Sequence, residues 1–217
     1  MTPPLVRAEG YRLLGLCFGY PRPDEFCAEL SGTACLPDSL GGFTPLAQLV
    51  DADLEGEYNR LFSTSVAVAP CETSYLRTDK GARMGQLAAL YDAFGARVGG
   101  RERERTDHVG SQLEFASLVC LNEAIAEQTN DSERLAISED VHRVLAREHL
   151  ATWLPAFVQR LESAAQHPFY QALGPLLDRW VKQDLAEHEW SADPVECDPL
   201  PDDDACITCP MAPKGPQ

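Results

Sequence analysis

Hydrophobic residues recur three and four positions apart along most of the chain, which is the spacing of amphipathic helices. A further short helix is expected after Asp24, which would cap it, and before Ser31. Sustained alternation of apolar and polar residues, typical of a set of strands, is not found. The pattern therefore predicts an all-α fold, a globular helical bundle. The longer helices are predicted over residues 4–18, 43–49, 54–62, 83–94, 107–128, 139–153, 155–165 and 168–187.

Two segments interrupt this pattern. Residues 63–79 contain a proline and many small side chains, which predicts a loop longer than a simple connection requires. Residues 95–106 combine three glycines with alternating Arg and Glu, which predicts an exposed hinge. Thr106 would cap the helix that follows, and Asp107 would complement the dipole at its start. We expect Asp107 and His108 to lie side by side at the surface of this hinge.

The C-terminal part of the chain has a different composition. Residues 184–217 carry nine acidic residues and one basic residue, and six prolines follow residue 193. Proline removes helical options, and a strongly acidic segment with few apolar residues has little to pack. The sequence therefore predicts a helical domain over residues 1–189, followed by a disordered acidic tail over residues 190–217.

The cysteines fall into two groups. Cys197, Cys206 and Cys209 form the pattern C-x8-C-x2-C in the tail, which makes them candidate ligands for zinc or iron, with His188 as the nearest histidine. Apart from that site, no permanently bound cofactor is expected. The other five lie in or beside apolar stretches and are expected to be reduced, structural side chains: Cys17, Cys27, Cys35, Cys71 and Cys120.

Charge and hydropathy exclude several classes of protein. The 217 residues include 34 acidic and 18 basic side chains, a formal net charge of −16. Such a chain would be repelled by nucleic acid and anionic lipid, and it favours cationic partners such as basic peptides. Apolar runs are too short for the roughly 20 residues of a membrane span, and the N-terminus does not resemble an export signal. A cytoplasmic location without stable membrane insertion is expected.

Common catalytic motifs are missing from the sequence. It has no G-x-x-x-x-G-K-[ST], no G-x-S-x-G and no H-E-x-x-H. Acidic side chains are so numerous that no pair of them can be assigned to general acid and base catalysis. The sequence therefore predicts no catalytic residue, and we interpret the protein as a non-enzyme.

Several short motifs occur in a characteristic order. They are E-Y-N-R-L-F at residues 57–62, P-C-E-T-S-Y at 70–75, D-H at 107–108 followed by L-E-F, and W-L-P at 153–155. Together they resemble the TorD/DmsD/NarJ family of molybdoenzyme-specific chaperones, over roughly residues 5–187. The sequence departs from the family pattern at Thr106, where the family usually has proline, and in its cysteine-bearing tail.

The resemblance implies a TorD-like helical bundle and a cytoplasmic assembly chaperone. Such proteins hold the catalytic subunit of a DMSO-reductase-type enzyme so that the molybdenum cofactor can be inserted, and many also bind its twin-arginine signal peptide. The expected partners are therefore the apo catalytic subunit and its basic signal peptide, with the chaperone as a monomer or a homodimer. An acidic surface with an apolar groove would suit such a peptide.

The motifs also indicate which residues bind the partner. Apolar residues at the helical spacing of Tyr58 and Phe62 are more often core residues than contacts. Tyr75 could anchor the loop to the body instead of contacting a partner, and His108 could be a satisfied histidine in the turn that caps a helix. The candidate partner-binding residues are Tyr58, Phe62, Glu72, Tyr75, Asp107 and His108.

Two other functions remain open at this stage. The first is a metal- or redox-active helical protein that uses the C-terminal cysteines. The second is a helical adaptor subunit unrelated to molybdenum enzymes.

Overall fold

The computed structural model describes residues 1–32, 43–97 and 105–194. Cys35, the three tail cysteines and most of the predicted tail and hinge lie outside these residues. The described part of the chain is helical and contains no strand; an isolated antiparallel bridge pairs Cys71 with His108. The predicted all-α fold is confirmed.

Nine α-helices form the described body, together with short π-helical and 3-10 turns. The π-helical turns are Asn59–Ser63 and Leu145–Leu150, and the 3-10 turn is Glu72–Ser74. The α-helices are α1 (Pro4–Cys17), α2 (Pro23–Ser31), α3 (Phe43–Ala47), α4 (Leu54–Tyr58), α5 (Lys80–Ala93), α6 (Val109–Thr129), α7 (Ser132–Val144), α8 (Ala151–Ala164) and α9 (Pro168–Glu187).

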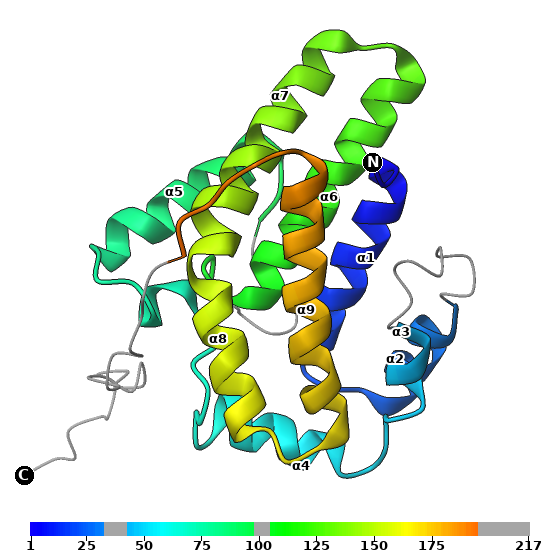
Figure 1. Ribbon diagram of the computed structural model, residues 1–217, viewed down its shortest axis with the longest axis vertical. Coiled ribbons are helices and arrows are strands. Elements are labelled where there is room, and N and C mark those ends of the chain that lie inside the picture. Colours follow the sequence, from blue (N-terminus) through cyan, green and yellow to red (C-terminus); the bar gives the residue numbers. More distant parts are fainter. Residues whose placement is uncertain (33–42, 98–104, 195–217) are drawn as a thin grey trace, which may run out of the picture.

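The bundle is built around α1, α6, α8 and α9, which run side by side in Figure 1. α1 packs along α6, α7 returns beside α6, and α8 and α9 pack as a pair. α2 and α3 cover one side, α4 lies at one end, and α5 lies on the side opposite α2. This arrangement buries one continuous aromatic and aliphatic core that includes Phe18, Trp153 and Phe157. No helix among the described residues is long and apolar enough to cross a lipid bilayer.

The contact between α1 and α9 depends on a glycine. A Cβ atom added at Gly10 would lie 1.9 Å from the ring of Trp180. Because no side chain can occupy that space, glycine lets the indole pack directly on the backbone of α1. The residue before Pro3 and the last residue of α9 also meet here, since the Thr2 hydroxyl donates to Glu187 at 2.8 Å.

The predicted helix boundary at Pro155 is wrong. Pro155 lies inside α8, which begins at Ala151 and continues from α7 through the π-helical turn Leu145–Leu150. Proline inside a helix removes one backbone hydrogen bond and crowds the preceding turn. The wider π turn lies directly before that point and lets the chain continue as a helix instead of ending.

Two predicted helix caps are also wrong. α2 starts at Pro23, whose fixed φ suits the first helical position, and Asp24 lies within the first turn. The N-cap of α6 is His108 rather than Thr106, and its ring accepts from the backbone N–H of Gly110.

The first residues of the predicted tail contact the helical body. The Trp190 ring stacks on His188 with centroids 4.3 Å apart, and it meets His142 edge-on at 5.1 Å. Arg147 Nε donates to the carbonyl oxygen of Ser191 at 2.7 Å. Residues 190–194 therefore cross the bundle from α9 toward α8, as the orange segment in Figure 1 shows. Residues 195–217 lie outside the described residues.

Candidate partner-binding site

The structure brings two of the sequence motifs together. The backbone N–H of Glu72 donates to the carbonyl oxygen of Asp107 at 2.9 Å, and the N–H of Val109 donates to that of Pro70 at 2.8 Å. These bonds fix the loop before α5 against the start of α6. The P-C-E-T-S-Y and D-H motifs are thus a single structural unit, although more than 30 positions separate Glu72 from Asp107.

Glu72 lies at the centre of this unit and is fully buried. Its carboxylate accepts from Arg83 Nε at 2.6 Å and from Gln112 Nε2 at 2.6 Å. His149 Nδ1 lies 3.1 Å from the same carboxylate. One buried acid therefore connects α5, α6 and the π turn before α8, and its charge is matched by Arg83.

Tyr75 anchors the loop to α8. Its hydroxyl donates to the carbonyl oxygen of Ala69 at 2.9 Å, and its ring lies 5.3 Å from that of Trp153. Trp153 Nε1 in turn donates to Gln112 Oε1 at 3.2 Å. Only 2% of Tyr75 is exposed, so of its two predicted roles the anchoring one fits the described structure.

The prediction that Asp107 lies at the surface is wrong. Asp107 is fully buried, and its carboxylate accepts from Thr73 Oγ1 at 2.7 Å and from the Thr73 N–H at 3.2 Å. Arg105 Nε and Nη2 lie 2.9 and 3.0 Å from the two carboxylate oxygens. Such a bidentate pair is geometrically specific, so this acid already has its arginine within the same chain.

His108 is also buried, with 8% of the residue exposed. Its Nδ1 accepts from the N–H of Gly110 at 3.1 Å, which requires an unprotonated nitrogen. The pKa of His108 is lowered to about 4, mainly by burial, with Asp107 opposing the shift and Arg105 adding to it. The imidazole is therefore a neutral helix cap at physiological pH.

Tyr58 and Phe62 belong to the core. Each is 8% exposed, and their rings lie 5.4 Å apart. The Phe62 ring also packs on Phe18, directly after α1, and on Tyr170 in α9, so it connects these two helices. Their helical spacing allowed either a core role or a partner contact, and the packing of the described residues matches the core role.

Glu57, in the same motif, organises the turn before α9. Its carboxylate pairs with Arg60 Nε at 2.7 Å and accepts from the backbone N–H groups of Gln166 and His167 at 2.6 and 3.1 Å. Burial alone would raise the pKa of Glu57, but these donors lower it to about 2. The carboxylate therefore stays ionised and satisfies two N–H groups at the start of α9.

The residues that complete these networks were missed by the sequence reasoning. Arg83 and His149 lie outside the motifs, and Arg105 and Gln112 lie beside the D-H motif without being part of it, so the motif match selected none of them. One signal was available, because a buried carboxylate needs a cation or several donors. The missed residues are Arg83, Arg105, Gln112 and His149.

Comparison with known proteins places this arrangement in a family. The family model described as nitrate reductase delta subunit matches residues 25–159. The chain is 30% identical to the chlorate reductase assembly chaperone protein of Ideonella dechloratans, over 82% of this chain and 88% of the relative. The chain belongs to the nitrate reductase delta subunit (TorD/NarJ) family. This confirms the family that the motifs resemble.

Other relatives of this TorD/NarJ-family chain extend the match. It is 30% identical to the selenate reductase assembly chaperone protein of Thauera selenatis, over 82% of this chain and 88% of the relative. It is 29% identical to the chaperone protein TorD of Vibrio cholerae, over 62% of each chain. The matched family segment begins in α2 and ends in α8, so it includes the whole Glu72 and Asp107 network.

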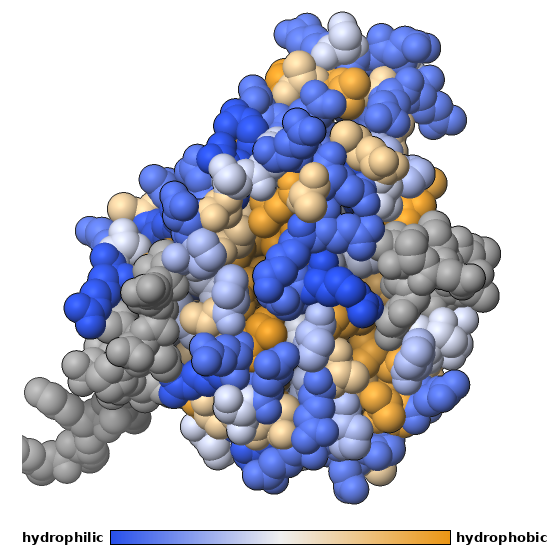
Figure 2. Space-filling view, viewed as in Figure 1, coloured by the Kyte–Doolittle hydropathy of each residue, from blue (hydrophilic) through white to orange (hydrophobic). Residues whose placement is uncertain are grey.

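The surface of this TorD/NarJ-family protein carries an apolar cavity of about 200 Å³. It lies between α8 and α9, where Figure 2 shows hydrophobic side chains between more polar neighbours. Its apolar walls include Leu154, Pro155, Val181 and Leu185, and Asp178 and Lys182 also line it. The cavity is distinct from the buried motif network and reaches the molecular surface.

Proposed function

We propose that this protein is an assembly chaperone for the catalytic subunit of a DMSO-reductase-type molybdoenzyme. It would bind that subunit before the molybdenum cofactor is inserted and release it afterwards, without a reaction of its own. The observation that carries the proposal is the similarity, over most of the chain, to proteins named as assembly chaperones of chlorate and selenate reductases. These names favour an oxyanion reductase as the client.

The proposed contact surface lies on the loop of residues 63–79. Glu72, Tyr75, Asp107 and His108 are buried, so they support the loop from within, and Tyr58 and Phe62 support its N-terminal end. Residues 63–65 and 77–79 are exposed. We therefore assign direct contact to these exposed flanks and a supporting role to the six motif residues.

A second contact is proposed for the client's signal peptide. The apolar cavity between α8 and α9 would receive the hydrophobic stretch of the peptide, and the acidic surface would attract its paired arginines. Because exposed charges are screened by salt, this binding should weaken as ionic strength rises. Since the client must be held before export, the chaperone would act in the cytoplasm.

Co-purification of the chain with the apo catalytic subunit tests the main proposal. The charge reversal Arg77→Glu alters the exposed flank of the loop and should reduce recovery of the client. Arg97→Glu makes the same change at an exposed position beyond α5 and should not. A strain that lacks the chaperone should make the client polypeptide without its molybdenum cofactor. A fully active client in that strain would disprove the proposal.

Calorimetric titration with the signal peptide at two salt concentrations tests the second contact. Leu185→Gln places a polar group in the apolar cavity and should weaken binding, while Leu121→Gln, on exposed α6 surface, serves as the matched control. Equal peptide affinity in both variants would place the peptide elsewhere.

Metal content and a redox titration of the purified chain would distinguish the alternative in which Cys197, Cys206 and Cys209 form a metal or redox centre.

A further inference from the structure

A second buried polar cluster joins α1, α6, α7 and α9 and does not take part in the motif network. His142 from α7 lies at its centre. Its other members come from the three neighbouring helices and from the residue after α9. The cluster consists of Arg7, Tyr11, Cys120, Glu123, His142, Asp184 and His188.

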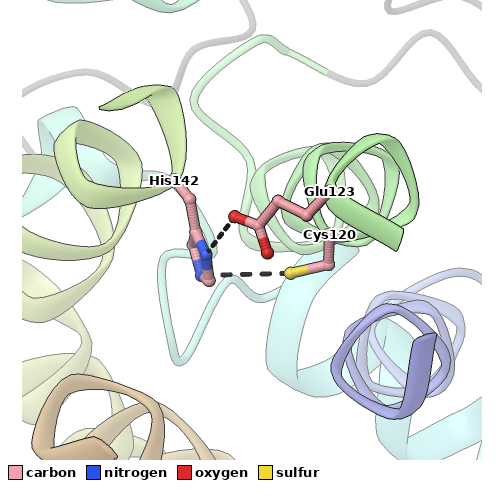
Figure 3. A group of neighbouring side chains, drawn as sticks. All are labelled: Cys120, Glu123 and His142. Carbon is pink, nitrogen blue, oxygen red and sulfur yellow. Dashed lines mark hydrogen bonds and ion pairs between the residues drawn. The ribbon is translucent and has the colours of Figure 1, made fainter. Parts of the chain in front are cut away.

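Both nitrogens of the His142 ring have partners. Nδ1 lies 2.9 Å from Glu123 Oε1, and Nε2 lies 2.8 Å from Asp184 Oδ2. Figure 3 shows the ring reaching from α7 toward α6, with Nδ1 toward Glu123 and the opposite edge toward Cys120. The sulfur of Cys120 is 3.9 Å from Nε2. The Nε2 side of the ring therefore faces a set of groups that can bind a metal ion.

Three of these groups lie close enough to share one ion. Ligand atoms of His142, Asp184 and His188 all lie within 4.8 Å of one another. Asp184 and His188 are four positions apart, so the helical repeat of α9 directs both toward the same side. His188 Nδ1 lies 3.3 Å from Asp184 Oδ1 and 2.8 Å from the backbone carbonyl oxygen of Asp184, a contact that ligation through Nδ1 would replace.

One carboxylate oxygen in this set has no hydrogen bond. Asp184 is 4% exposed, and its Oδ1 is buried without a hydrogen-bond partner. Arg7 Nε is 3.7 Å from this oxygen, beyond hydrogen-bonding distance. The other oxygen, Oδ2, accepts from the Tyr11 hydroxyl at 2.6 Å. A buried oxygen of this kind is costly unless a ligand satisfies it.

The charges of the cluster also favour a cation. Glu123 and Asp184 contribute two carboxylates, and Arg7, which is 2.5 Å from Glu123, is the permanent cation among them. With a neutral His142, one negative charge would remain buried without compensation. A proton on His142 or a bound divalent ion would offset it.

We propose that His142, Asp184 and His188 bind a divalent transition-metal ion, with zinc as the best match. Imidazole and carboxylate ligands suit Zn²⁺, and three protein ligands leave one position for water or for the nearby Cys120 thiol. Glu123 would serve as the outer partner of His142. A metal-binding histidine usually donates its other ring N–H to a carboxylate, and here that contact is already formed.

Trp190 gives the site a spectroscopic reporter. Its ring stacks on His188 at 4.3 Å and meets His142 edge-on at 5.1 Å. The His188 side chain is 12% exposed, so an ion can reach the ligands at the edge of this ring. A bound paramagnetic ion should therefore quench the fluorescence of Trp190 in particular.

Equilibrium dialysis against Zn²⁺ tests the proposal. The dialysis uses a full-length variant with the substitutions Cys197→Ser, Cys206→Ser and Cys209→Ser, so that the tail cysteines cannot bind the ion. We expect about one zinc per chain, and loss of that zinc in Asp184→Asn and in His188→Gln. Glu123→Gln should weaken binding by about 10- to 100-fold, since it removes the outer partner. His167→Asn, at the other end of α9, should bind zinc normally.

A second measurement covers variants that fail to fold. Co²⁺ added to the chain with the three serine substitutions should quench part of its tryptophan fluorescence, and Trp190→Phe should abolish that quenching. Circular dichroism identifies the folded variants. If the folded chain with serine in the tail takes up no zinc and shows no quenching, the cluster is a buried ion network only. Full zinc uptake by folded His188→Gln would also overturn the proposed ligand set.

Discussion

The Glu72 carboxylate lies 3.1 Å from Nδ1 of His149, although 77 positions separate the two residues along the chain. Arg83 approaches the same carboxylate at 2.6 Å from α5. Arg83 and His149 therefore both rely on the buried Glu72 carboxylate, for its negative charge or as a hydrogen-bond acceptor. The stability of this region should therefore be unusually sensitive to that single side chain.

Glu72→Gln should lower the free energy of unfolding by about 2–4 kcal/mol. Glutamine keeps the size of the side chain but removes the charge that compensates Arg83, and an unmatched buried partner is costly. Urea unfolding monitored by circular dichroism would measure the change. Glu148→Gln is the control, because that side chain is exposed and should change stability by less than about 0.5 kcal/mol. Equal effects of the two variants would show that Glu72 does not stabilise the fold.

Asp107→Ala should reduce stability by about 3 kcal/mol, because it leaves Arg105 and the Thr73 N–H without their acceptor. Any loss of client binding should then follow the loss of folded protein. Asp107→Asn keeps an acceptor oxygen and should retain more of both. Binding measured at a temperature where both variants are folded separates the two effects. A folded Asp107→Ala protein that does not bind the client would instead show that binding requires the local loop structure that Asp107 holds.

His108 should make the protein less stable in mild acid. Its pKa is about 4 in the folded state and near 6.5 in the unfolded chain, so the unfolded state binds more protons between these values. Stability is fully present above about pH 6.5 and falls as pH decreases toward 4, by up to about 3 kcal/mol. Urea unfolding across this range measures the slope.

His108→Asn provides the comparison for that slope. Asparagine is a good helix N-cap and does not titrate, so it preserves the cap on α6 while removing the proton linkage. The variant should lose stability less steeply between pH 6.5 and 4. Parallel profiles for the two proteins would mean that other groups cause the acid sensitivity.

Two glycine substitutions should have opposite effects. Gly10→Ala forces a methyl group into the Trp180 ring and should destabilise the fold by about 1–3 kcal/mol or more. Gly85→Ala lies on α5, where an added Cβ meets nothing within 4 Å, and should stabilise the helix by about 0.5–1 kcal/mol. Thermal unfolding of the two variants would measure this contrast. A neutral Gly10→Ala would mean that α1 and α9 can move apart without cost.

Much of the fold could be predicted because the helical repeat is a local property. The predicted helices over residues 4–18 and 168–187 agree with α1 and α9 to within one residue. The boundary at Pro155 failed because a π turn, which the hydrophobic pattern does not reveal, lets the helix continue. The cap predicted at Thr106 failed because several residues near 106–108 can accept a hydrogen bond from a free N–H, and the pattern does not show which of them does.

The motifs located the candidate site but did not reveal how its residues act. When only its neighbours in sequence are considered, Asp107 looks like an exposed acid at the start of a helix, and Tyr75 fits either a loop anchor or an exposed contact. Their burial depends on Arg105, Thr73 and Trp153, and these contacts are set by tertiary packing. The partner-binding role of the motif residues itself stays a prediction.

The contact between α1 and α9 affects how this protein completes its own folding. The Tyr11 hydroxyl donates to Asp184, 173 positions later, and the Gly10 surface is covered by Trp180. During synthesis the nascent chain exposes this face of α1 until α9 has left the ribosome. α6 emerges earlier and can cover another face of α1. The newly made chain therefore acquires its full core only after α9 has been synthesised.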